Sequence, residues 1–123
     1  MSNLVLYRIS NGNITEAFAP DKWYDAAGIA IGTIATVATP TTGKRLRLLG
    51  GSISVSAAVS VLFEDNAAGA ANFIRRTPKL VADTPYQLDF GPRGVLLSAA
   101  NNVVKATGSG AANLTGTLWG IEE

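Results

Sequence analysis

The stretch from Gly50 to Asp65, GGSISVSAAVSVLFED, alternates between apolar residues and small residues that are mostly serine. Alternation with a period of two is typical of a strand with one buried face, because successive side chains point to opposite sides of a sheet. It predicts one strand ending near Ser56, a bend at Ala57-Ala58 and a second strand ending near Phe63. The predicted buried positions are Ile53, Val55, Ala57, Val59, Val61 and Phe63.

Turn signals break the rest of the chain into short runs rich in β-branched and apolar residues. Asn11-Gly12 is typical of a two-residue hairpin turn, Gly50-Gly51 indicates a bulge or a turn, and residues 64–69 read as a loop. Residues 20–25 fit either one helical turn or an extended arm. Residues 29–37 favour a strand, although a helical period also fits. The remaining predicted strands cover 4–9, 44–49, 73–76, 86–90, 94–98, 103–107 and 114–121.

About eight short strands at this spacing predict an all-β, antiparallel β-sandwich of the jelly-roll kind. The 123 residues suit one domain. We expect residues 28–123 to form the sandwich and residues 1–27 to form a strand and an extended N-terminal docking arm.

Composition excludes several kinds of chemistry. The chain has no histidine and no cysteine, so it cannot build a Ser–His–Asp site, a Cys–His site or a typical zinc site. Residues 41–44 lack the upstream glycine of a phosphate loop, and Glu64-Asp65 offers neither a second catalytic carboxylate nor regular calcium-loop spacing. We expect no enzyme activity, no cofactor and no bound metal.

Charge and hydropathy also limit the partners. A net charge of +1 lacks the basic excess of proteins that bind nucleic acid directly. The N-terminus has no secretory signal pattern, and the uncharged run 26–43 is too short and too mixed in composition to span a bilayer. We expect a protein made in the cytoplasm, with neither nucleic acid nor membrane as a partner.

In several predicted strands, apolar residues follow one another directly, so apolar side chains would point to both faces of the sheet. One face of each sheet in an antiparallel sandwich normally meets water. A bulge, or a loop folded over the sheet, would explain any single pair. Four pairs together favour contacts between subunits, and they predict a homo-oligomer, a trimer first and a dimer second. The residues assigned to that interface are Leu49, Leu62, Leu96 and Trp119.

Two basic clusters and one aromatic cluster are the remaining candidates for binding. The basic clusters contain Lys and Arg that either guard exposed strand edges or dock on an acidic protein surface. The aromatic cluster near the N-terminus fits core packing, an interface anchor or a platform for sugar rings. The residues predicted to dock are Phe18, Trp23, Tyr24, Arg45, Arg47, Arg75 and Arg76.

The sequence from Lys44 to Glu123 resembles small virion proteins of tailed bacteriophages. The resemblance rests on KRLRL entering a Ser/Val-rich strand, on GVLL, and on the closing ANNVVKATGSGAANLTGTLWGIEE, with its Trp-Gly strand and Glu-Glu tail. It implies a jelly-roll capsid decoration (cement) protein, which binds the major capsid protein at joints between subunits and stabilises the expanded head. It also implies a place on the capsid exterior after synthesis in the host bacterial cytoplasm.

Two other functions remain open from the sequence. One is the receptor-binding head of a phage fibre, which could bind carbohydrate. The other is a freestanding lectin-like module. Copy number in a purified particle would separate a decoration protein from a fibre head.

Overall fold

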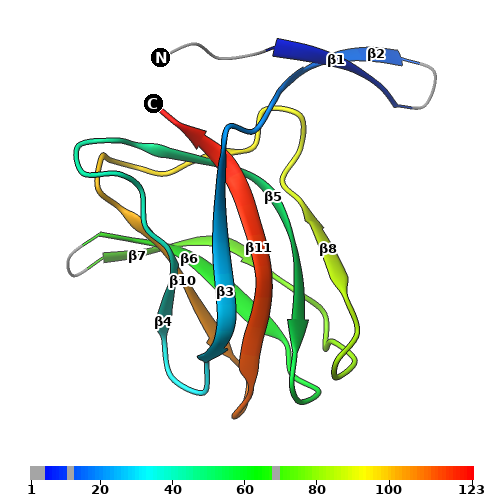
Figure 1. Ribbon diagram of the computed structural model, residues 1–123, viewed down its shortest axis with the longest axis vertical. Helices are drawn as coiled ribbons and strands as arrows, with labels where there is room; N and C mark the ends of the chain where they lie inside the picture. The colour runs from blue at the N-terminus through cyan, green and yellow to red at the C-terminus, as the bar shows by residue number, and fades with distance from the viewer. Residues whose placement is uncertain (1–4, 11–12, 68–69) are drawn as a thin grey trace.

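The computed structural model describes residues 5–10, 13–67 and 70–123, and every regular element in them is a β-strand. The all-β prediction is confirmed. Two antiparallel sheets face each other, and a separate two-stranded hairpin lies at one end (Figure 1).

The larger sheet has the order β3-β11-β5-β8, and the short strand β9 also pairs with β5. The smaller sheet has the order β4-β10-β6-β7. Most connections cross from one sheet to the other, which is the double-sheet topology of a jelly roll. The strands are β3 (Lys22–Ala30), β4 (Ala35–Ala38), β5 (Leu46–Val55), β6 (Val61–Ala67), β7 (Ala70–Arg76), β8 (Tyr86–Asp89), β9 (Val95–Leu96), β10 (Val103–Gly108) and β11 (Asn113–Glu122).

The core lies between the two sheets and follows the predicted alternation. Ile53 and Val55 on β5, and Val61 and Phe63 on β6, are at most 2% exposed, while Ser52 and Ser54 lie on the outer face. Each such side chain contributes about 1.5–3 kcal/mol when it leaves water. The buried core cluster continues through Leu46, Leu48, Leu88, Leu97, Val104, Ala106, Leu114 and Leu118.

Two local predictions were wrong, and an alternative that the sequence left open is decided. Residues 29–37 are not one strand, because β3 ends at Ala30 and a bend at Gly32-Thr33 precedes β4 in the opposite sheet. Residues 20–25 fitted either a helical turn or an extended segment, and they are extended, since β3 begins at Lys22. Residues 64–67 are not loop, because β6 continues to Ala67 with Asp65 directed inward.

The Gly50-Gly51 signal marks a bulge inside one continuous strand. Trp119 pairs with Gly50 and Gly120 pairs with Leu48, so Leu49 is the extra residue on β5. The glycines let β11 approach closely, as a Cβ on Gly51 would lie 2.8 Å from the Thr117 carbonyl oxygen.

The N-terminal segment is a hairpin followed by a strand of the sandwich. β1 (Val5–Ser10) pairs with β2 (Asn13–Phe18) in a register that joins Ser10 to Asn13, as a two-residue turn requires. The turn residues Asn11 and Gly12 lie outside the described part of the chain. β3 then pairs with β11 from Lys22 onward, so the sandwich begins there and not at residue 28.

Candidate functional site

The base of the hairpin is fixed to the sandwich by Phe18. Its backbone N–H donates to the Pro92 carbonyl at 2.9 Å. The guanidinium of Arg47 lies 4.9 Å from the centre of the Phe18 ring, and that of Arg93 lies 5.6 Å from it. Cation–π contacts at such distances contribute about 0.5–1 kcal/mol where they are solvent-accessible. The hairpin therefore leaves the sandwich from an anchored position.

Arg45 and Arg47 both have partners within the chain. Arg47 Nε lies 2.5 Å from Glu123 Oε2, and its Nη1 donates to the Arg93 carbonyl. Arg45 donates from Nε to the Leu97 carbonyl and from Nη2 to the Ser98 carbonyl. The predicted docking residues Phe18, Arg45 and Arg47 thus gather at the end of the sandwich that carries the hairpin, where they also hold its loops.

The second basic cluster has its two arginines in different surroundings. The Arg75 guanidinium is 5.0 Å from the centre of the Phe90 ring, and its Nη2 donates to the Asp89 carbonyl. Arg75 therefore contacts the segment between β8 and β9, to which Arg47 also donates through the Arg93 carbonyl. Arg76 is exposed and lies opposite Leu62 on the outer face of the smaller sheet.

The predicted aromatic cluster is divided between two faces of the larger sheet. Trp23 is 59% exposed on the outer face, whereas the next residue, Tyr24, packs against the core. This follows from the alternation of side chains along β3. The neighbour of Trp23 is instead Trp119, which lies directly opposite it on β11. Tyr24 is therefore a structural residue, and sequence spacing alone did not show the Trp23–Trp119 pair.

Tyr24 forms part of a buried carboxylate cluster. Its hydroxyl donates to Glu122 Oε2 at 2.7 Å, and the Thr41 N–H donates to the same oxygen at 3.0 Å. Burial, reinforced by the Glu122 carboxylate, raises the pKa of Tyr24 above its ordinary value. Burial alone would raise the pKa of Glu122, but the hydrogen bonds from Thr41 and Tyr24 outweigh it and lower that pKa. The cluster joins β3, β11 and the loop after β4.

We expect Glu122→Gln to lower the free energy of unfolding by about 1–2 kcal/mol at pH 7, because a neutral amide accepts weaker hydrogen bonds than a carboxylate. The folded-state pKa of Glu122 is below its ordinary 4.5, so the carboxylate stabilises the fold above pH 4.5 and stops doing so as the pH falls through the folded value. Urea unfolding from pH 7 to pH 3 should show the variant's deficit shrinking. A deficit that is the same at every pH would contradict this role.

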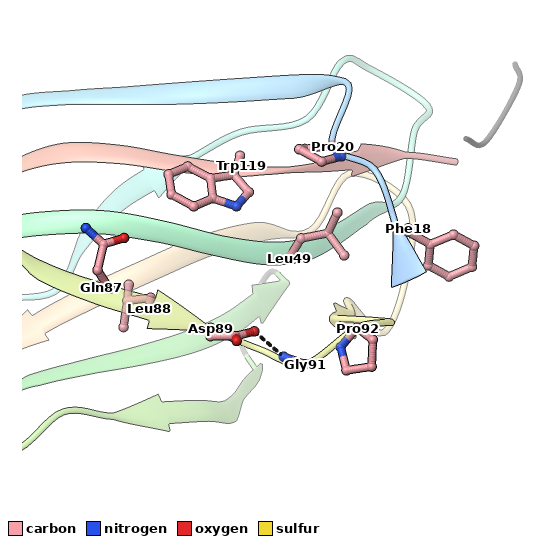
Figure 2. A pocket seen from close by; sticks show the side chains of 9 residues that line it. All are labelled: Phe18, Pro20, Leu49, Gln87, Leu88, Asp89, Gly91, Pro92 and Trp119. Carbon is pink, nitrogen blue, oxygen red and sulfur yellow. Dashed lines mark hydrogen bonds between the residues drawn. The ribbon is translucent and has the colours of Figure 1, made fainter. Parts of the chain in front are cut away.

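A groove of about 360 Å³ opens on the outer face of the larger sheet, beside the base of the hairpin (Figure 2). Trp119 and Gln87 lie toward one end, Phe18 and Pro92 toward the other, and Leu49 lies between them. Asp89 Oδ1 accepts from the Gly91 N–H at 2.9 Å on its lower edge. Pro20, Leu88 and Gly91 complete the lining.

The groove also accounts for one of the four apolar pairs. Leu49 is only 7% exposed and lines the groove together with Phe18 and Pro20 (Figure 2). A Cβ on Gly94 would lie 2.7 Å from Leu49 Cδ2, so the segment before β9 packs closely against this side chain. Little of Leu49 is therefore left for a second subunit. Leu62, Leu96 and Trp119 remain half-buried on outer or edge positions.

The described residues include no group of three or more Asp and Glu side chains that could hold a metal ion. Asp65 serves a structural network instead, since Oδ2 accepts from the Ser98 N–H at 2.7 Å and Oδ1 from Asn102 Nδ2 at 2.8 Å. Sequence reasoning missed this network because the two donors are distant in the chain.

Comparisons with models of protein families, with curated proteins and with solved structures found no match. Within the described part of the chain, no helix is long and apolar enough to span a membrane.

Proposed function

We propose that the chain is a capsid decoration protein that binds the major capsid protein at joints between subunits and stabilises the expanded head. The observation that carries this proposal is the hairpin β1–β2. Within the described residues it pairs only with itself, and it extends from one end of the β-sandwich (Figure 1). An isolated two-stranded hairpin is marginally stable in water, so a docking surface on another protein would stabilise it.

The register of the hairpin supports a docking role. Val5, Tyr7 and Ile9 occupy positions on one face, together with their β2 partners Phe18, Glu16 and Ile14. Positions on the other face include Leu6 and Ala17 beside Arg8, Ser10, Asn13 and Thr15. The first face therefore has five apolar positions and one carboxylate position, Glu16, a mixture that suits contact with another protein.

The rest of the surface suits a scaffold that contacts several neighbours. Phe73 is 69% exposed on the outer face of the smaller sheet, where Leu62 is half-buried. We place the contacts between copies in the proposed trimer on this face. Several modest contacts on one shell reinforce each other through effective concentration. A protein that binds only the expanded lattice stabilises that state by linkage.

Quantitative mass spectrometry of purified particles of the virus that encodes the chain tests the function. We expect hundreds of copies in a fixed ratio to the major capsid protein. A handful of copies per particle would contradict the proposal and favour a fibre head.

Removal of residues 1–17 tests the hairpin separately. Heads stripped of the protein should rebind the full chain and become more resistant to heat, whereas the truncated chain should bind at least about tenfold more weakly, because it loses the docking strands. Near-ultraviolet circular dichroism checks that the truncated sandwich stays folded, since Trp23 and Trp119 both remain. Val81→Ala in the full chain is the control for hairpin docking, because it shortens a side chain that is 69% exposed and belongs to neither proposed contact. Equal binding by the folded truncated chain would exclude the hairpin as the docking element.

A further inference from the structure

We propose that the outer face of the larger sheet binds a short neutral oligosaccharide, which lies across the strands from Trp23 to the groove beside Asp89. This proposal does not rest on the decoration function. It rests on two adjacent rows of side chains, one aromatic and one polar, together with the groove at their end.

The aromatic row begins with two indoles on neighbouring strands. Trp23 on β3 pairs with Trp119 on β11, which pairs with Gly50 on β5, which pairs with Asp89 on β8. A Cβ on Gly50 would lie only 2.9 Å from Trp119 Nε1, so the missing side chain leaves room for the indole to lie against the strand. The C–H face of a pyranose ring is apolar and stacks on such surfaces, and here it would cover the exposed Trp23 and the half-buried Trp119.

The neighbouring row is polar and held in place by hydrogen bonds. Thr117 Oγ1 donates to Asp25 Oδ1 at 2.8 Å, and Gln87 Nε2 donates to Ser52 Oγ at 3.0 Å. Thr117 and Ser52 are themselves a register pair. Each carboxylate or carboxamide has further hydrogen-bonding capacity toward a ligand hydroxyl. Because internal bonds already orient these side chains, binding costs less conformational entropy.

The charge of the surface selects the class of ligand. Among the described residues, those that line the groove include no Lys or Arg, although Arg47 and Arg93 lie over the Phe18 ring at one end of it. Beside the indoles the charged group is the Asp25 carboxylate, to which a neutral polyol can donate hydrogen bonds and which would repel a sulfated glycan. The groove volume of about 360 Å³ falls at the lower end of the usual range for small-molecule sites.

The length of the surface favours more than one sugar ring. Three steps between neighbouring strands separate Trp23 from Asp89, which is about 14 Å at about 4.8 Å per step. One pyranose ring cannot contact both ends of this row. A chain of a few rings can stack on the indoles while its far end enters the groove shown in Figure 2.

The two tryptophans of the chain, Trp23 and Trp119, both lie in the proposed site, so intrinsic fluorescence reports on it directly. The full chain is titrated with maltohexaose, cellohexaose, chitohexaose, mannohexaose and xylohexaose. We expect a saturable change in tryptophan emission with at least one of them. A heparin hexasaccharide should give none. No saturable response to any neutral probe, or a response to heparin alone, would overturn the proposal.

Variants locate the site. Trp23→Ala and Gln87→Ala each remove an exposed side chain and should weaken binding about tenfold, as expected for the loss of one stacking ring or one oriented hydrogen-bonding group. Isothermal titration calorimetry measures this loss without relying on the tryptophan signal. Phe73→Ala is the matched control, because it removes an equally exposed aromatic ring from the opposite sheet. If Phe73→Ala weakens binding as much as Trp23→Ala does, the proposed site is wrong.

Discussion

Gly116→Ala is expected to lower the free energy of unfolding by about 3 kcal/mol or more, a large part of the stability of a domain of this size. Gly116 has φ +148°, and a Cβ there would lie 2.7 Å from Ile53 Cα and closer still to the Ser52 carbonyl oxygen. Both contacts are with backbone of the central strand β5, so they cannot be relieved by a side-chain rotation. Urea denaturation followed by circular dichroism measures the loss.

Gly28→Ala is the matched control for Gly116→Ala. Gly28 lies in the same irregular part of the β3–β11 ladder and has φ +63°, but no heavy atom lies within 4 Å of its Cβ position. Gly28→Ala should therefore lower the free energy of unfolding by only about 1 kcal/mol, which is the cost of placing an alanine in the left-handed backbone conformation. Equal losses in the two variants would show that steric contact with β5 is not what makes Gly116 necessary.

Asp65→Ala is expected to lower the free energy of unfolding by about 3 kcal/mol. The substitution removes the acceptor of the Ser98 N–H and one of the two acceptors of the Asn102 amide, which also donates to Ser98 Oγ, and each loss in a buried site costs about 1–3 kcal/mol. Asp65→Asn tests the reason, because its shape is the same but its NH2 group would face one of these donors. Both variants should lower the urea midpoint.

The same Asp65 variants should loosen the loop after β9, because Arg45 also reaches the Ser98 carbonyl and Asn101 N–H donates to the Lys44 carbonyl. Hydrogen exchange at residues 98–102 should accelerate relative to exchange in β11. If hydrogen exchange at residues 98–102 is unchanged while the urea midpoint falls, Asp65 stabilises the core and not the loop.

The alternation of apolar and small residues predicted correctly those strands that have one buried face. Ile53, Val55, Val59, Val61 and Phe63 followed the predicted parity, because a one-residue slip would turn the whole apolar set toward water. Ala57, at the bend between the two strands, is only half-buried. Residues 29–37 could not be divided from the sequence, since their β-branched residues fit a strand throughout and nothing local shows that the chain changes sheets at Gly32. The inward position of Asp65 depends on Ser98 and Asn102, and no local pattern contains them.

The candidate site could also be predicted only in part, because its contacts join residues that are distant in the sequence. Arg47 could be selected as a surface cation, but its contacts with Phe18 and Glu123 join three distant parts of the chain. Leu49 looked like an interface residue because a bulge displaced it from the core face, and its close packing against Gly94 is visible only after folding. Trp23 and Trp119 become neighbours only through the register of β3 and β11.

The placement of the C-terminus affects how the protein could carry a cargo. Glu123 exchanges backbone hydrogen bonds with Arg45 and lies at the same end of the sandwich as the hairpin (Figure 1). A reporter fused after Glu123 would emerge beside the hairpin and crowd it. The exposed turn at Ser109-Gly110-Ala111 lies at the far end, between β10 and β11. A peptide epitope inserted in this turn would project away from the hairpin and from the C-terminus.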